Sequence, residues 1–332
     1  MADNTHKKQK CFRYVAIVLA VVFLFSVVAF IVTKWEKKNG EHSASSDFSD
    51  EEFIEYNGKK YAPNENVETF LVLGLDKTSS GTSAESYNND KQSDFIMLFI
   101  FDNKLKEYTA IQINRDTMAS VNILGLAGEK LDSKTMQIAL AHTYGNGKER
   151  SCRNTADAVS QLLFGIDIKN YASVTMDSVP IYNDLLGGVE VTVLDDLTSV
   201  DPSLVKGEKV LLHGELALKY VRSRHGLEDS SNAARMLRQQ QYLEALREKT
   251  VERIANDNEF VAKAVLKMSE YMVSNRTVTQ LQQLMSKLSE YKFNGLTDFR
   301  GEYTQGEEYM EFYPEQEYLK ETVIELFYNP IE

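Results

Sequence analysis

The sequence predicts an α/β domain in which a central mixed, largely antiparallel sheet is covered by helices on both faces (an α-β-α sandwich), preceded by one N-terminal transmembrane helix. Continuously apolar runs such as FIMLFIF (95–101) are typical of strands buried on both faces. Segments with helical periodicity are frequent enough to supply that cover. The transmembrane helix is indicated by twenty uncharged residues, Tyr14–Thr33, which suffice to span a bilayer.

The N-terminal segment predicts the orientation of the chain. Basic residues in the short tail, residues 1–13, closely precede the apolar run, so the tail should stay in the cytoplasm and the rest lie outside. A cleavable signal peptide is the alternative. Its apolar core is usually shorter, however, and no small-x-small cleavage pattern occurs before Lys34 and Trp35. We therefore expect a single-pass type II protein of the cell membrane with an extracellular domain.

The polar residues 34–66, rich in Ser, Asp, Glu and Lys, favour a linker between the membrane and a folded domain at 67–330. Strands are predicted where apolar or β-branched residues run between turn signals, at 68–76, 94–101, 107–114, 189–193 and 299–303. Helices are predicted from their periodicity at 133–144, 154–164, 177–186, 213–221, 233–255, 259–273, 278–288 and 315–328.

The charge distribution argues against a general affinity for polyanions. The chain carries net charge −12, and its first thirteen residues contribute +3 (four basic residues against Asp3), so the remainder sums to −15. Five of the twelve arginines nevertheless fall between Arg222 and Arg247. Clustered arginines in an acidic chain suggest one specific anion site, since a guanidinium binds phosphate or carboxylate oxygens two at a time. The alternative is a charged helix face paired with glutamates.

Strand order brings a second group of charged residues to one edge of the sheet. The first strand ends at Asp76 and the second begins at Asp94, so antiparallel pairing places both aspartates at the same edge. The third strand returns after a tight connection, which brings Arg115 and Asp116 there too. Two carboxylates and an arginine that converge are suited to a divalent cation and the phosphate it neutralises. Aspartates beside strands are also common turn residues, which is the alternative.

The arginine segment fits the same site. Arg222 and Arg224 are two residues apart and share a side only where the chain is extended. On the following helix, Arg235 and Gln239 lie four residues apart on one face, and Arg238 lies one turn from Arg235. The N-terminus of that helix adds its own preference for anions.

Several motifs, in their order and spacing, resemble the LytR–CpsA–Psr family of bacterial membrane-anchored cell-wall proteins. They are FLVLGLD, the SD of QSDFIMLFI, the RDT of INRDT, AHTYGNG, LLGGVEVTV, HGELALKYVRSRH and ARMLRQQQYL. The resemblance runs from Phe70 to Phe327 and implies a phosphotransferase at the outer membrane face of Gram-positive-type cells. It implies transfer of an anionic glycopolymer, such as teichoic acid or capsule, from a polyprenyl-pyrophosphate carrier to peptidoglycan. The product would be a phosphodiester, and the implied cofactor is Mg²⁺, or Mn²⁺ in its place.

The resemblance also implies roles for single residues. The expected catalytic residues are Asp76, Asp94, Arg115 and Asp116, of which Asp76 and Asp94 match the aspartates of the metal and pyrophosphate site. The pyrophosphate-binding set comprises Arg115, Arg222, Arg224, Arg235 and Gln239, and Arg238 joins it as their neighbour on the helix. Asp116 would orient Arg115 or help to take the proton of the acceptor.

Some positions depart from the family pattern. Asn114 stands where the family has a proline before Arg-Asp, and Asn232 stands where it has an aspartate. Lys77 lies near the place of an absent arginine. Residues 137–139 replace a Lys-Ile-Asn stretch, and His142 replaces a tyrosine. These changes leave the main charged residues in place and bear on the choice of substrate.

Three functions stay open at this point. The first is the ligase that the resemblance implies, and the second is a pyrophosphatase that hydrolyses the carrier pyrophosphate when no acceptor is bound. The third is a non-catalytic lipid-binding or regulatory membrane protein, since the family was long described as transcriptional attenuators. Outward orientation and the lack of a basic DNA-binding tail argue against nucleic acid as a partner.

The expected substrate makes a further demand on the fold. A polyprenyl carrier is too apolar to leave the membrane unshielded, so we expect an apolar groove beside the arginines. Its candidate walls are the apolar faces of the helices within 133–164 and 233–273, together with the sheet.

Overall fold

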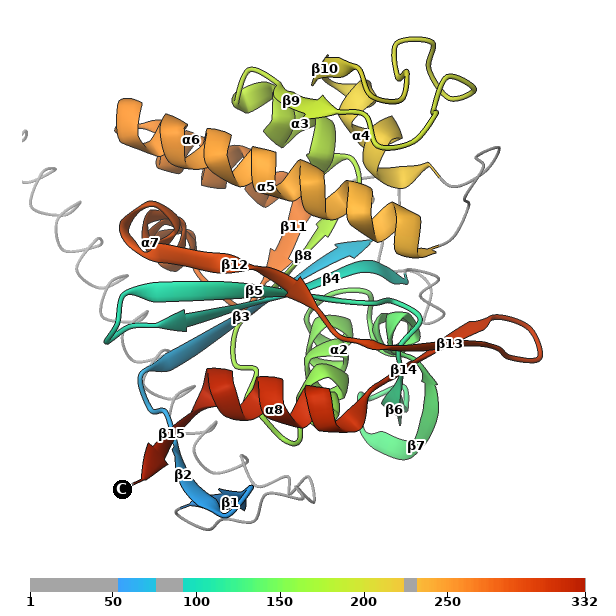
Figure 1. Cartoon of the computed structure of the whole chain (residues 1–332), viewed down its shortest axis with the longest axis vertical. Helices are drawn as coiled ribbons and strands as arrows, with labels where there is room; N and C mark the ends of the chain where they lie inside the picture. Colours follow the sequence, from blue (N-terminus) through green and yellow to red (C-terminus); the bar gives the residue numbers. More distant parts are fainter. Residues whose placement is uncertain (1–52, 76–91, 224–231, 332) are drawn as a thin grey trace, which may run out of the picture. The chain divides into compact units, whose positions relative to one another are not determined.

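A six-stranded sheet runs through the middle of the folded domain (Figure 1). The computed structural model describes residues 53–75, 92–223 and 232–331, and within them the strand order is β11-β8-β3-β4-β5-β12. The strands are β3 (Val67–Leu75), β4 (Ser93–Asp102), β5 (Glu107–Ile113), β8 (Tyr171–Thr175), β11 (Met272–Ser274) and β12 (Lys292–Asp298). Three neighbouring pairs are antiparallel and two are parallel, which confirms the predicted mixed, largely antiparallel sheet.

The pairing of β3, β4 and β5 brings together the end of β3, the start of β4 and the end of β5. Leu75 at the end of β3 pairs with Ser93 at the start of β4, and Ile113 at the end of β5 pairs with Ile96. The strand ends beside Asp94 and Arg115 therefore meet at one edge of the sheet, as the sequence predicts. Asp76, the residue that follows β3, lies outside the described residues.

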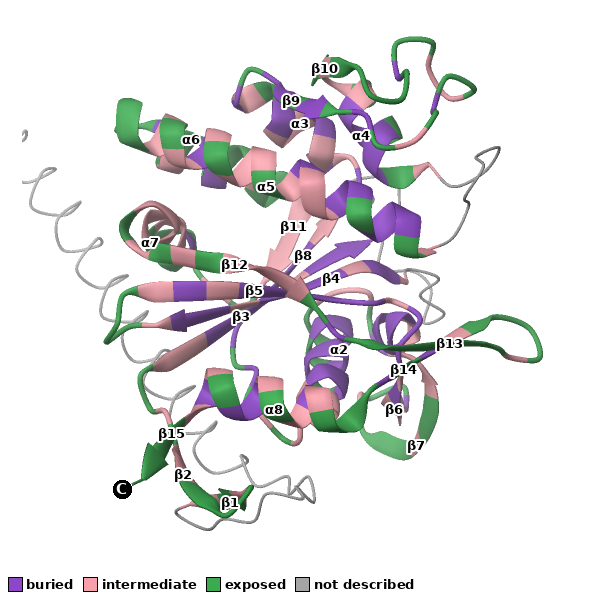
Figure 2. Ribbon diagram, viewed as in Figure 1, coloured by how far each residue is buried: buried purple, intermediate pink, exposed green. Residues whose placement is uncertain are grey.

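Helices cover both faces of the sheet (Figures 1 and 2). Successive side chains of a strand point to opposite sides, so continuously apolar strands need cover on both faces. Leu73 and Ile96 pack on one face with α2 (Glu149–Leu162) and α8 (Gln316–Phe327). Phe70 and Phe101 pack on the other face with residues from the helices on that side. The remaining elements on that side are α3 (Ser178–Leu185), β9 (Val189–Thr192), β10 (Lys209–Leu212), α4 (Glu215–Arg222), α5 (Asn232–Asn256), α6 (Phe260–Met268) and α7 (Val278–Glu290). Figure 2 shows the middle strands as the most buried part of the domain.

The helix predicted at 133–144 is wrong. That region forms the strand β7 (Lys130–Gln137), paired antiparallel with β6 (Met118–Leu124), and then the short 3₁₀ helix η1 (Ile138–Thr143). Most side chains of β7 are exposed or half-buried. The strand is therefore held by backbone pairing to β6 rather than by an apolar face of its own. Its sequence for this reason lacks the alternating hydrophobic pattern that would predict a strand.

Other strands also differ from the prediction. Residues expected in the linker form β1 (Ile54–Tyr56) and β2 (Lys59–Pro63), and β2 pairs with β15 (Tyr328–Ile331). The last predicted strand, 299–303, is the first half of a hairpin made of β13 (Gly301–Gln305) and β14 (Met310–Pro314). β8 and β12, the two parallel strands added to β3 and β5, were not predicted.

The predicted transmembrane segment, Tyr14–Thr33, lies outside the described residues. Among the helices that the structure does describe, none combines the length and the apolar character that a bilayer crossing requires.

Candidate functional site

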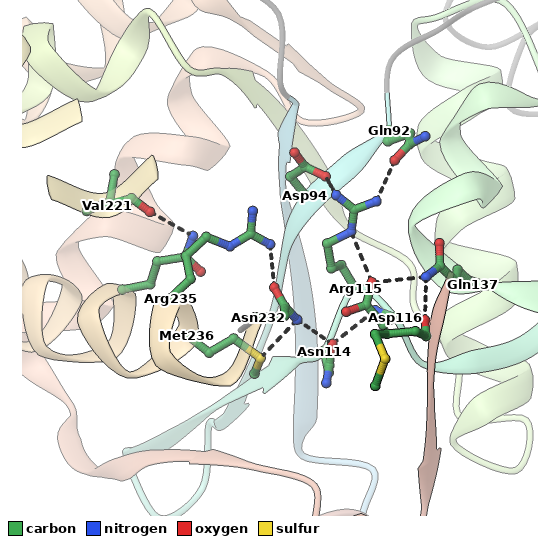
Figure 3. A network of polar contacts seen from close by, with 12 residues as sticks. Gln92, Asp94, Asn114, Arg115, Asp116, Gln137, Val221, Asn232, Arg235 and Met236 are labelled. Atoms are coloured by element: carbon green, nitrogen blue, oxygen red, sulfur yellow. Dashed lines mark hydrogen bonds and ion pairs between the residues drawn. The ribbon is translucent and has the colours of Figure 1, made fainter. Parts of the chain in front are cut away.

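The centre of the candidate site is an ion pair at the edge of β4 and β5. Arg115 donates through Nη1 to Asp94 Oδ1 and through Nη2 to Gln92 Oε1 (Figure 3). The side chains of Arg115 and Asp94 are only 11% and 7% exposed. A charge-assisted hydrogen bond in such a sheltered place fixes the direction of the guanidinium.

Asp116 supports this arginine from the next position. Its Oδ1 lies 3.4 Å from Arg115 Nε and accepts a hydrogen bond of 3.1 Å from Gln137 Nε2. The backbone N–H of Asp116 donates to Asn114 Oδ1 over 3.0 Å. This geometry agrees with the predicted role of orienting Arg115, whereas the role in proton transfer stays a prediction.

Helix α5 brings a second arginine to the same edge from the other face of the sheet. Arg235, which is 3% exposed, donates through Nη2 to Asn232 Oδ1 over 2.5 Å. One turn further along α5, Gln239 Oε1 accepts a hydrogen bond of 2.9 Å from Gln112 Nε2 on β5. The start of α5 is thus held against the end of β5, so that Arg235 and Arg115 flank the strand ends (Figure 3).

Two asparagines join the two halves of the site. Asn232 Nδ2 donates to Asn114 Oδ1 over 2.7 Å, and Asn114 Nδ2 donates to Tyr303 Oη over 2.6 Å. The orientation of each amide is fixed by an unambiguous donor, the guanidinium of Arg235 for Asn232 and the backbone N–H of Asp116 for Asn114. Burial raises the pKa of Tyr303 above its ordinary value, so its hydroxyl stays protonated and able to donate in turn. These asparagines are the two departures from the family pattern that flank the predicted arginines.

A double-mutant cycle should detect this link. We expect Asn114→Ala and Asn232→Ala each to lower the free energy of unfolding, because each leaves a partly buried partner unpaired. The double variant should lose about 1 kcal/mol less than the sum of the single losses, as measured by denaturant unfolding. Asn170→Ala supplies the control, since Asn170 bonds to Thr69 O away from Asn232 and should combine with Asn232→Ala additively. Additive losses for Asn114 and Asn232 would contradict the link.

Arg238 is separated from this group. Its side chain is 1% exposed, and its guanidinium is held by Asp195 Oδ2 and by the backbone oxygens of Tyr220 and Ser223. Adjacent residues on a helix differ by about 100° in direction, so Arg238 and Gln239 point to different neighbours although both lie near Arg235 in sequence. These contacts favour a structural role for Arg238 over the predicted phosphate contact.

The other predicted residues are placed only in part. Arg222 is the last residue of α4, and its side chain is exposed. Asp76 and Arg224 lie outside the described residues. In the described ranges, no group of three or more His, Cys, Asp and Glu side chains is arranged to hold a metal ion.

Sequence reasoning missed the polar residues that support the charged ones. Gln92 and Gln137 bind Arg115 and Asp116, and Gln112 anchors α5 to β5. Gln112 is recognisable in the sequence as a polar residue within the apolar run AIQI. In the structure it is only 2% exposed. A buried polar side chain needs a partner, which here is Gln239.

An apolar cavity of about 160 Å³ lies between the sheet and α5. Met97, Phe99 and Phe293 line it from the strands, and Leu243 and Leu246 line it from α5. Leu243 is eight residues beyond Arg235 on the same helix, which corresponds to about 12 Å along the axis. The cavity agrees with the predicted walls at 233–273 and the sheet, whereas no residue of 133–164 lines it.

Comparison with known proteins identifies the family. The model of the LytR_cpsA_psr family matches residues 28–325, which is most of the chain. The chain belongs to the LytR–CpsA–Psr family. A curated member with similar sequence is the cell wall biosynthesis protein LcpA of Corynebacterium glutamicum, which is 30% identical. The match covers 46% of this chain and 32% of LcpA, so the chain spans about a third of the length of that relative.

Solved structures share the LytR–CpsA–Psr fold seen here. TagT bound to LIIa-WTA gives a TM-score of 0.58 at 22% identity, covering 86% of this chain and 98% of TagT. TagV of B. subtilis gives 0.57 at 24% identity, covering 78% and 96%. The protein gbs0355 from Streptococcus agalactiae gives 0.62 at 19% identity, covering 78% and 87%.

Proposed function

We propose that this LytR–CpsA–Psr protein is a phosphotransferase that attaches an anionic glycopolymer, such as teichoic acid or capsule, to peptidoglycan. The polymer would arrive on a polyprenyl-pyrophosphate carrier and end in a phosphodiester link. The observation that carries this proposal is the pair of sheltered arginines, Arg115 and Arg235, which reach one sheet edge from its two faces. A pyrophosphate brings dense charge, and guanidinium groups on both sides are suited to hold it.

The proposed reaction has one bond-forming step. A hydroxyl oxygen of the acceptor bonds to the phosphorus next to the polymer, the bond from that phosphorus to the bridging oxygen breaks, and polyprenyl phosphate leaves. The proton of the hydroxyl passes to a carboxylate at this edge, for which Asp116 is the candidate. Most of the rate enhancement in such a transfer comes from positioning and charge stabilisation.

The oxygen-rich side chains at this edge fit Mg²⁺, or Mn²⁺ in its place. Asp94, Asp116 and Gln92 carry carboxylate and amide oxygens, the ligands that hard cations prefer, and in this structure one oxygen of each lies against the guanidinium of Arg115. Asp94 would hold the cation together with Asp76, which lies outside the described residues. When bound, the cation would neutralise charge on the phosphates.

The apolar cavity is the proposed binding site for the lipid part of the carrier. A polyprenyl chain needs an apolar surface beside the pyrophosphate site, and the cavity along α5 starts within a few turns of Arg235. Because the carrier is a membrane lipid, we propose that the domain works at the outer face of the cell membrane, held by the segment Tyr14–Thr33.

Product analysis tests the proposed function. The full-length protein would be incubated with a lipid-linked glycopolymer and a peptidoglycan oligomer, with and without Mg²⁺. We expect polymer attached to peptidoglycan only when Mg²⁺ and the acceptor are both present. Release of free polymer phosphate even in the presence of acceptor would instead favour the pyrophosphatase. Carrier binding without any turnover would favour the non-catalytic lipid-binding protein.

A further inference from the structure

The hairpin β13–β14 projects from the domain at the edge that carries the candidate site (Figure 1). Its second strand, β14, is fixed to the loop at 114–117 and to Gln137. Phe312 N donates to Asp116 O over 2.9 Å, and Gln137 Nε2, which also bonds to Asp116, donates to Met310 O over 2.7 Å. Tyr303 on the other strand accepts the hydrogen bond from Asn114. These contacts hold the hairpin next to Arg115 and Asp116. Most of its other side chains are exposed to solvent.

Exposed aromatic residues are concentrated on this hairpin. Within the described part of the chain, all three exposed aromatic side chains belong to it, namely Tyr303, Tyr309 and Tyr313, at 40%, 64% and 46% exposure. Every other described Phe and Tyr is buried or half-buried. Tyr303 pairs with the buried Phe312 and lies on the inner face of the hairpin, whereas Tyr313, the next residue along β14, lies on the outer face. Single exposed apolar residues need no explanation, but exposed rings on the outer face and in the turn of one projecting element indicate a binding surface.

The charge of the hairpin selects among the possible occupants. Between Gly301 and Pro314 the sequence contains Glu302, Glu307, Glu308 and Glu311 and no Lys, Arg or His. Such a surface repels an anionic polymer, so the glycopolymer on the carrier is a poor occupant. Tyr313 Oη donates to Glu311 Oε2 over 2.7 Å, which places a carboxylate beside an exposed ring. A ring next to a hydrogen-bond acceptor suits a ligand with both apolar C–H faces and hydroxyl groups, which is the chemistry of a sugar.

We propose that the β13–β14 hairpin is the docking surface for the acceptor saccharide chain, whose rings stack on Tyr309 and Tyr313. This inference rests on the proposed function, which requires an acceptor as well as a glycan donor. The two substrates then meet at the loop 114–117 from different sides. The anionic donor is held by Arg115 and Arg235, and the acceptor follows the hairpin inward to Asp116.

The test is a comparison of two double variants in the full-length protein, with peptidoglycan glycan strands as the acceptor. Tyr309→Ala/Tyr313→Ala should raise the acceptor KM at least about tenfold, since two ring contacts are removed. It should leave the donor KM and the hydrolysis of donor without acceptor unchanged. Tyr309→Phe/Tyr313→Phe keeps both rings and should stay close to wild type. Leu105→Ala is the matched control, because Leu105 is 65% exposed in the β4–β5 turn at the opposite edge.

Three outcomes of the kinetic comparison would overturn this inference. They are an unchanged acceptor KM in the alanine double variant, an equal rise in Leu105→Ala, or a parallel rise in the donor KM. A direct binding measurement with the same glycan strands separates the inference from the proposed function. If wild type shows no turnover but binds the strands and the alanine variant does not, the docking surface stands and the proposed reaction fails. Equal binding by both proteins would overturn the docking surface itself.

Discussion

Replacing Arg115 with alanine is expected to lower kcat/KM for the lipid-linked donor roughly 100-fold. The proposed function has its guanidinium bind the donor phosphate through two hydrogen bonds, and its removal also leaves the buried Asp94 carboxylate without its ion-pair partner. The loss should appear in transfer assays at saturating acceptor. Arg115→Lys should recover only part of it, since lysine keeps the charge and loses the planar fork. Arg235→Ala should act in the same direction from the other face of the sheet.

The control for these arginine variants is Lys249→Ala. Lys249 lies on the same helix as Arg235 and pairs with the exposed Glu252 over 2.9 Å, so its removal should cost little. If Arg115→Ala and Arg235→Ala both matched wild type in donor affinity and turnover, the two sheltered arginines would have a structural role only and the candidate site would be lost.

Replacing Arg238 with alanine is expected to lower the free energy of unfolding by about 3 kcal/mol or more. The change breaks the buried ion pair with Asp195 and leaves the backbone oxygens of Tyr220 and Ser223 without this hydrogen-bond donor. Denaturant unfolding measures this loss. In the fraction that stays folded, the donor KM should be that of wild type. Arg238→Met should be less damaging, since it keeps much of the buried volume.

The opposite pattern would restore the role predicted from the sequence. Wild-type stability in Arg238→Ala together with a clearly raised donor KM would mean that Arg238 binds phosphate. Arg235→Ala provides the comparison, because the two arginines lie one turn apart on α5 and only Arg235 is linked to the loop at 114–117 through Asn232.

The edge of the sheet could be predicted because β3, β4 and β5 are strongly apolar and β4 and β5 are joined by a tight turn. Their order fixes which strand ends lie together, so the sequence alone places Asp94 near Arg115, as the strand pairing confirms. Family resemblance then supplied the roles. The partners of these residues could not be predicted, since Asn114 and Asn232 are 118 positions apart and nothing local in either segment indicates the other.

Two differences between the predictions and the structure have physical causes. The prediction of a helix at 133–144 is wrong because the side chains of β7 are mostly exposed, so no buried apolar face marks the strand in the sequence. The spacing of Arg235 and Arg238 on α5 predicts that they are neighbours, but it does not show in which direction each long side chain turns. In Arg238 the nearby carbonyls at the end of α4 and the carboxylate of Asp195 decide the direction.

The fate of the phosphorus atom distinguishes transfer of a phosphate-linked polymer from hydrolysis of the donor. A donor labelled with ³²P at the phosphorus next to the polymer would be incubated with the full-length protein, Mg²⁺ and peptidoglycan strands. We expect the label to enter the peptidoglycan fraction and to stay there after phosphatase treatment, because it lies in a phosphodiester. Label that remains with the lipid, or that phosphatase removes as a monoester despite the presence of acceptor, would contradict this expectation.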